Sequence, residues 1–273
     1  MILSAASFSI MAAIVKATEH SVTIKSFSRQ FITALIAIII ILSNNIRFIP
    51  KRKNLNKLFL RCIFGSLGVF LYFYSIDHLY LANVSILTRL SPFFVTIFAF
   101  LFLKEKISLI NWLIFIPMII GCILIIQPNS KLFNPISIYA ILSAISGAFA
   151  YTMIKAIGKE ESAYTIVFWF SLSSSIIYFL IGHNEFKIIE NINYINLFLI
   201  GLFGILGQLG LTKSYQLANA SLVAPFSYSY VLFSIIFGII FWNEIPDTLS
   251  ILGFFLIIIS YFILINNQSY SKS

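Results

Sequence analysis

The stretch LSAASFSIMAAIVKA (residues 3–17) decides the fold of this chain, because it returns as LSAISGAFAYTMIKA at residues 142–156. The two copies are identical at six positions, including the Lys-Ala pair that ends each of them. A second pair, LANVS (81–85) and LANAS (217–221), lies further along each half. Several matches at similar offsets indicate that the chain was built by internal duplication.

The composition predicts that this duplicated unit lies in a membrane. Hydrophobic residues make up 60% of the chain, charged residues only 10%, and the mean hydropathy is +0.98. A soluble chain carries about 25% charged residues, and a transmembrane helix needs about 20 apolar residues. Long apolar runs without alternation argue against strands. Polar breaks separate ten apolar segments, near 1–17, 24–43, 58–76, 84–103, 108–126, 135–155, 163–182, 194–214, 220–242 and 248–266.

Each half contains five of these segments, so the second copy must enter the membrane from the opposite side. We therefore expect an all-α integral membrane protein of ten transmembrane helices, arranged as two inverted-topology five-helix repeats at 1–127 and 134–266. Such repeats are typical of carriers that work by alternating access and hold the substrate near the bilayer midplane.

The basic residues support this topology. If the first helix starts in the cytoplasm, twelve of the 18 lysines and arginines fall at cytoplasmic ends and five at outer ends. This asymmetry predicts cytoplasmic N- and C-termini. It also explains the net charge of +9 by contact with anionic lipid headgroups, so no nucleic-acid partner is expected. The Ile-, Phe-, Asn- and Lys-rich composition resembles that of AT-rich bacterial genomes, including those of host-dependent bacteria, which favours uptake. We expect a multi-pass protein of the bacterial cytoplasmic (inner) membrane.

Two stretches carry a resemblance to a known family, ANVSILTRLSPFFVTIFAFLFLKEKIS (82–108) and ANASLVAPFSYSYVLFSIIFGIIFWNEIPD (218–247). Each combines an Ala-rich entry, a Pro-containing helix and a Glu just after it, here Pro92 with Glu105 and Pro225 with Glu244. In this pattern the chain resembles the drug/metabolite transporter superfamily, in its ten-helix EamA-type branch. The glycine that often precedes the family's Glu is replaced by Lys104 and Asn243.

The resemblance implies a secondary active transporter for a small polar or zwitterionic metabolite. The family includes amino-acid exporters and importers of riboflavin or S-adenosylmethionine, and NPISIYAILSAIS (134–146) is similar to the S-adenosylmethionine uptake branch. An amino-acid or drug exporter of the same fold is one alternative. A passive channel or a lipid scramblase is the other.

Arg89 is the sharpest candidate for substrate recognition. It lies six residues after Asn83, about 9 Å into the fourth segment, and a cation at that depth is a functional candidate. Its guanidinium can bind a carboxylate or a phosphate through two hydrogen bonds. The alternatives are a fixed structural partner or a side chain that reaches the interface.

Other polar and aromatic residues within the segments complete the expected site. In APFSYSY (224–230), Pro225 removes a backbone donor and can kink the helix that carries the hydroxyls. Interhelical packing is the alternative for each of these residues. Beside Arg89, the expected substrate contacts are Thr88, Ser91, Tyr228, Tyr230, Ser227, Gln208, Tyr72 and Tyr151. The expected hinges are Pro92, Pro225, Gly204 and Gly207, the last two with close helix packing as the alternative. Lys16, Lys155, Glu105 and Glu244 are expected to act as gates or as structural ion pairs.

Nothing in the sequence points to an enzyme. The histidines His20, His78 and His183 are far apart, and there is neither an HExxH motif nor a phosphate-binding glycine loop. The two cysteines lie in apolar runs, which favours packing over a disulfide or a metal site. We therefore expect no cofactor and no metal. The expected partners are a small-molecule substrate and the lipid bilayer, and the sequence leaves monomer and homodimer open.

Overall fold

The computed structural model describes residues 1–104, 115–126, 134–187, 194–217 and 229–270, apart from some side chains within the helices. All regular elements in these ranges are helices. They are α1 (Ile2–Lys16), α2 (Val22–Ser43), α3 (Leu55–His78), α4 (Leu81–Thr88), α5 (Ser91–Leu103), α7 (Phe115–Ile126), α8 (Ser137–Ile157), α9 (Ala163–Ile181), α10 (Tyr194–Leu217), α12 (Ser229–Trp242) and α13 (Thr248–Tyr270), with short 3₁₀ turns at Arg52–Asn54, Gly158–Glu160 and Glu185–Lys187.

The helices belong in a membrane. Six helical spans among the described residues, with α4 and α5 counted as one, are long and apolar enough to cross a bilayer, and three shorter helices are apolar as well. Large apolar side chains such as Ile39, Leu180 and Ile240 are 60% or more exposed on the outside of the bundle. Lipid tails are the solvent that suits such a surface. The chain is therefore an all-α membrane protein, as its composition predicted.

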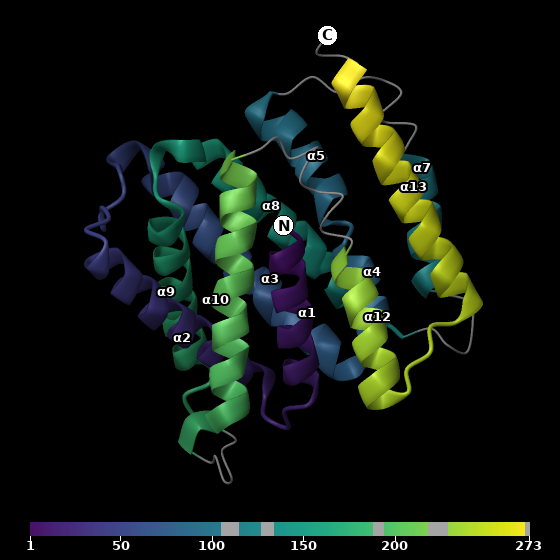
Figure 1. Ribbon diagram of the computed structural model, residues 1–273, viewed down its shortest axis with the longest axis horizontal. Coiled ribbons are helices and arrows are strands. Elements are labelled where there is room, and N and C mark those ends of the chain that lie inside the picture. The colour runs from purple at the N-terminus through teal and green to yellow at the C-terminus, as the bar shows by residue number, and fades with distance from the viewer. Residues whose placement is uncertain (105–114, 127–133, 188–193, 218–228, 271–273) are drawn as a thin grey trace.

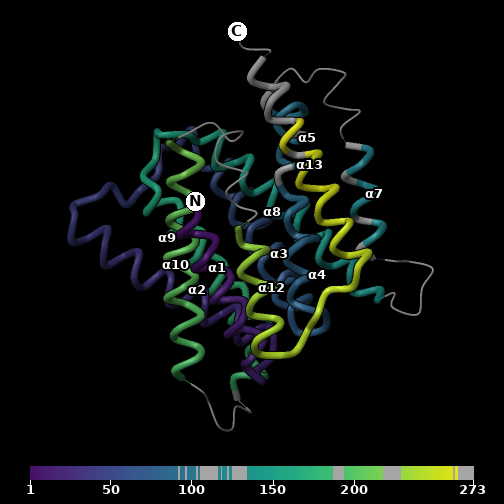
Figure 2. Tube along the Cα trace, turned by 45° about the vertical axis from the view of Figure 1, so that its right-hand side comes forward, coloured from purple at the N-terminus to yellow at the C-terminus, as the bar shows by residue number. Residues whose placement is uncertain are grey.

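Helix contacts repeat between the two halves. α3 packs on α8, and its counterpart α10 packs on α1; likewise α5 packs on α8 and its counterpart α12 on α1. Two further contacts join counterparts directly, α2 with α9 and α7 with α13. In Figures 1 and 2, α7 and α13 lie together at one edge of the bundle, away from α2 and α9. Exchanging the halves therefore leaves the contact scheme unchanged, as a pseudo-twofold axis between them requires.

α3 and α8 run antiparallel. Arg61, near the start of α3, lies 6.0 Å from the ring of Tyr151 in the second half of α8. Further along α3, the carbonyl of Gly68 accepts a 2.8 Å hydrogen bond from Ser143, near the start of α8. Small residues permit this contact, because a Cβ at Gly68 would lie only 3.2 Å from the nitrogen of Gly147.

α1 and α3 end at the same end of the bundle. The ammonium of Lys16, the last residue of α1, donates a 2.8 Å hydrogen bond to the carbonyl of Leu79, just after α3. We call this end the Lys16 end and the opposite one the Met1 end. Because α8 is antiparallel to α3, it runs opposite to α1, although the two helices share the repeated sequence. The second repeat is therefore inverted with respect to the first.

The two repeats also share a special backbone conformation. Lys104 ends α5 with φ +56° and Asn243 follows α12 with φ +52°, and the two residues are counterparts in the repeat. This left-handed region favours glycine and also suits asparagine. This chain therefore makes the same left-handed turn in both repeats without glycine.

The fourth expected segment forms one membrane-length span but not one continuous helix. α4 ends at Thr88, Arg89 and Leu90 adopt turn geometry, and α5 begins at Ser91 with Pro92 in its first turn. Proline is tolerated in a first turn because no helical donor is lost there. The break places Arg89 at a helix end inside the bundle rather than on a regular helix face.

Candidate substrate cavity

A cavity lies between the two repeats. It is lined by side chains from helices of both halves, whereas no described residue of α7 or α13 faces it. The lining combines apolar and aromatic side chains with polar groups that can orient a ligand, as small-molecule sites do. Its polar members are Arg29, Arg61, Tyr72, Thr88, Arg89, Ser91, Ser143, Tyr151, Gln208, Tyr215 and Tyr230.

Arg89 lines this cavity and lies against the ring of Tyr230. Its guanidinium carbon is 4.3 Å from the centre of the Tyr230 ring, a cation–π contact. The hydroxyl of Tyr230 is hydrogen-bonded to that of Tyr72, which links α12 to α3. The neighbouring Thr88 hydroxyl donates to the carbonyl of Val84 at 2.9 Å, so it is tied to its own helix. This arrangement holds one cation over an aromatic surface.

Arg29 enters the cavity from α2 and is 96% buried. Its aliphatic stem packs against α10, where a Cβ at Gly204 would lie 3.0 Å from its Cγ. Its Nη2 donates a 3.5 Å hydrogen bond to the side-chain oxygen of Gln208. The guanidinium carbon is 6.0 Å from the rings of Phe8 and Phe73. The neighbours of the Arg29 guanidinium therefore include two aromatic rings and an amide oxygen.

Arg61 enters from α3 near the Met1 end and is 98% buried. Its guanidinium carbon is 3.9 Å from the centre of the Phe170 ring. The side chain folds over Gly65, one turn further along α3, since a Cβ there would overlap Nη1 of Arg61 and lie 2.6 Å from Phe170 Cε2. Glycine at this position is what lets the guanidinium turn inward.

Two ion pairs lie at the Lys16 end. Lys16 is paired with Glu244, whose other oxygen accepts a 2.8 Å hydrogen bond from the backbone nitrogen of Leu81. Lys25 is paired with Asp77 at 2.5 Å, with the Lys25 side chain 98% buried. These contacts tie together the ends of α1, α3 and α12 and the starts of α2 and α4.

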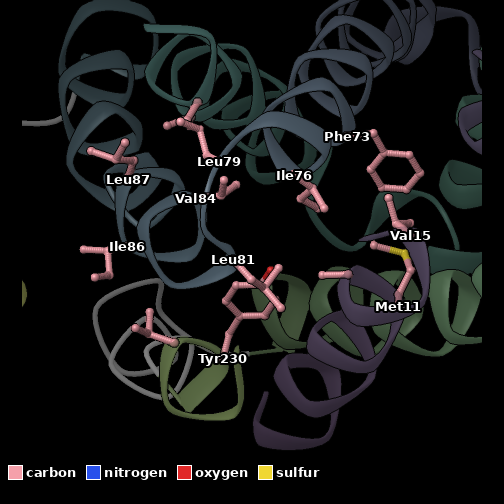
Figure 3. Packing of buried hydrophobic residues seen from close by; sticks show 14 of the residues in the cluster. Met11, Val15, Phe73, Ile76, Leu79, Leu81, Val84, Ile86, Leu87 and Tyr230 are labelled. Carbon is pink, nitrogen blue, oxygen red and sulfur yellow. The ribbon is translucent and has the colours of Figure 1, made fainter. Parts of the chain in front are cut away.

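Buried apolar residues fill the space between these ion pairs and the cavity. Figure 3 shows Val15, Ile76 and Leu81 among them, with Tyr230 at their border. Val15, Ile76 and Leu81 have no exposed surface. The Lys16 end is therefore closed, whereas the cavity extends to Met1 at the opposite end.

The structure brings many of the predicted substrate residues together. Arg89, Thr88, Ser91, Tyr230, Gln208, Tyr72 and Tyr151 all line the cavity. Ser227, Tyr228, Pro225 and Glu105 lie outside the described residues.

The remaining described residues of the predicted site lie on α8 and α10. Gly204 and Gly207 lie within the uninterrupted α10, where Gly207 packs against the ring of Phe8. Lys155 lies in the last turn of α8, at the end opposite Lys16. The hinge and gate roles remain predictions.

Two cations of the cavity, Arg29 and Arg61, are not among the predicted site residues. The distribution of basic residues along the sequence assigns both to a membrane surface. Each nevertheless lies inside one of the expected apolar segments, 24–43 and 58–76. The rule that singled out Arg89, a cation within a span, would have found them too.

Neither a metal centre nor a catalytic cluster stands out in the described part of the chain. No group of three or more His, Cys, Asp or Glu side chains is placed there to hold a metal ion. The polar groups of the cavity are instead guanidinium, hydroxyl and amide groups, which bind ligands by hydrogen bonds and charge.

Two inverted repeats of apolar helices around a polar cavity define the class of membrane transporters. The model of the EamA-like transporter family matches residues 1–127 and 134–266, so the chain belongs to that family.

Curated relatives agree with this class. The pseudopaline exporter CntI of Pseudomonas aeruginosa is 33% identical over 95% of this chain and 92% of its own length. Solute carrier family 35 member G1 of Homo sapiens is 30% identical over 92% of this chain and 74% of its own. An S-adenosylmethionine uptake transporter of Rickettsia conorii is 28% identical over 61% of this chain and 57% of its own length. A solved crystal structure matches with a TM-score of 0.66 at 12% identity, covering 100% of this chain and 96% of that one, and shows the shared fold.

Proposed function

We propose that this chain is a secondary active transporter that moves a small polar metabolite across the bacterial cytoplasmic membrane by alternating access. One observation carries the proposal: the cavity between the repeats reaches Met1 at one end and is closed at the other by two ion pairs and an apolar cluster. An alternating-access carrier needs a central site that faces one side at a time.

The distribution of lysines and arginines makes the Met1 end cytoplasmic, with both chain termini on that side. The cavity then faces the cytoplasm in this conformation. Repeats 1–127 and 134–266 are the units that would rock against each other. Arg89, Tyr72 and Tyr230 supply a binding surface at the inner end of the cavity.

Lys16 and Glu244 act as the outer gate in this proposal. The sequence repeat makes Lys155 and Glu105 their counterparts for the opposite end. Pro92 and Pro225 are the proposed hinges, because each lies in an apolar segment that follows a LAN stretch in the sequence.

Export is the direction that the relatives favour. The exporter from Pseudomonas aeruginosa matches nearly the full length of this chain, whereas the S-adenosylmethionine uptake transporter matches 61% of it. Uptake remains the second candidate, supported by the likeness of residues 134–146 to that branch.

Counterflow in proteoliposomes tests the proposal. Vesicles are loaded with a mixture of amino acids, organic acids, nucleosides, S-adenosylmethionine and riboflavin, and entry of the isotope-labelled mixture is followed by mass spectrometry. A carrier accumulates at least one labelled solute, and the rate rises when the same solute is present inside. Flux that does not saturate and shows no such stimulation would instead indicate a channel.

A further inference from the structure

Resting on the transport function proposed above, we propose that the cavity binds a polyanionic metabolite, one with two or three carboxylate or phosphate groups spread along its length. The reason is the convergence of Arg29, Arg61 and Arg89, from three different parts of the first repeat, on one cavity. A single anionic group can engage only one of these guanidinium groups fully through a two-hydrogen-bond contact.

Arg29 and Arg61 carry most of the inference, because they are buried and keep free donors. Arg29 is 4% exposed and Arg61 2% exposed. Among the described residues, Nε and Nη1 of Arg29 and Nε of Arg61 have no hydrogen-bond partner. Buried guanidinium donors without an acceptor are costly, so a ligand that supplies acceptors is stabilised strongly.

No carboxylate among the described lining residues neutralises this charge. Three acidic side chains elsewhere form ion pairs of their own: Asp77 with Lys25, Glu244 with Lys16, and Glu160 with Lys53. The described part of the cavity lining therefore presents net positive charge to a solute.

The aromatic rings around the cavity orient the guanidinium groups rather than neutralise them. Arg61 lies over the face of Phe170 and Arg89 over the face of Tyr230. A guanidinium stacked on a ring keeps its N–H donors in the plane at its edge. Those edges suit the in-plane oxygens of a carboxylate or a phosphate.

The cations are spaced for an elongated ligand. The Arg61 guanidinium lies at the level of Gly65, and Arg89 lies beside the linked Tyr72 and Tyr230 rings. Gly65 and Tyr72 are seven residues apart on α3, which is roughly 10 Å at 1.5 Å per residue. Two anionic groups on one small backbone can span this distance, whereas one group cannot.

The test measures binding of three probes that share a propane backbone: tricarballylate with three carboxylates, glutarate with two and butyrate with one. Purified full-length protein in detergent is titrated at fixed ionic strength by calorimetry. We expect the Kd to rise about tenfold for each carboxylate removed. Propane-1,3-diol bisphosphate forms a fourth arm. If this bisphosphate binds more tightly than glutarate, the anionic groups of the natural ligand are phosphates. If glutarate binds more tightly, they are carboxylates.

Arg61→Gln and Arg29→Gln should each weaken tricarballylate binding about tenfold and leave butyrate binding nearly unchanged. Lys53→Gln, outside the cavity and 64% exposed, serves as the matched control. If the arginine variants fail to fold, the Kd values of the three probes on the unaltered protein still test whether the cavity prefers a polyanion. Equal Kd values for tricarballylate and butyrate would overturn the inference.

This assay needs no vectorial transport, so it separates the two proposals. If the protein shows counterflow but no preference among the probes, the transport function is supported and the polyanionic ligand is refuted. If the protein prefers tricarballylate but shows no counterflow, the polyanion site is supported and the carrier mechanism is refuted.

Discussion

Glu244→Gln should open the Lys16 end of the bundle. Glu244 joins α12 to α1 through Lys16 and to α4 through the backbone nitrogen of Leu81. The substitution keeps the size of the side chain but removes the charge that balances Lys16. The closed conformation then holds a nearly buried ammonium without its counter-charge.

The size of the expected population shift follows from the burial of the Lys16–Glu244 ion pair. The side chains of Lys16 and Glu244 are 13% and 9% exposed. Removing one partner of a buried pair costs about 3–5 kcal/mol, and the lower value applies because Lys16 retains its bond to the Leu79 carbonyl. In a conformation open at this end, water solvates both groups and the loss is small. About 3 kcal/mol shifts the population toward the open form roughly 100-fold.

Cysteine labelling measures this shift. Ile76→Cys, placed in a chain whose Cys62 and Cys122 are replaced by alanine, reports access because Ile76 has no exposed surface. An impermeant maleimide added from the Lys16 side should modify it roughly 100-fold faster with Glu244→Gln. Glu160→Gln is the matched control, since it removes an ion pair on the exposed surface.

An unchanged labelling rate in a folded Glu244→Gln protein would refute the proposal that the Lys16–Glu244 ion pair closes this end. It would mean that the apolar cluster alone closes this end.

Three further outcomes test the packing. Gly65→Ala should push the Arg61 guanidinium off Phe170 and weaken tricarballylate binding about tenfold by calorimetry, with unchanged binding contradicting the inward fold of Arg61. Gly121→Ala should lower stability by about 1–3 kcal/mol in a thermal unfolding assay without changing that Kd, because its Cβ would lie 2.7 Å from the backbone oxygen at position 253 on the pair α7–α13, away from the cavity. Asn243→Val should lower stability by about 1–2 kcal/mol, because its φ is +52°, whereas Asn243→Gly should be neutral or slightly stabilising; equal melting temperatures for the two would contradict the turn.

The sequence alone located many of the cavity residues, but not its full charge. Arg89, Tyr72 and Gln208 were predicted because polar groups within apolar spans are costly and need a reason. Arg29 and Arg61 were interpreted as surface charges, although they are the most buried cations of the cavity. The pairing of Lys16 with Glu244, 228 positions apart, was also beyond the sequence, which suggested only that each had a gate or structural role.

The sequence by itself determined the membrane class, the ten apolar segments and the duplication, because hydropathy and repeat offsets are properties of the linear chain that the bilayer constrains. An odd number of segments per repeat was enough to predict the inversion. Only the tertiary structure decided which cations face the cavity. That choice depends on how each helix is rotated and on where a missing side chain, at Gly65 or Gly204, leaves room for a guanidinium. It also decided that the fourth span breaks at Arg89, since a helix end inside the bundle depends on its neighbours for support.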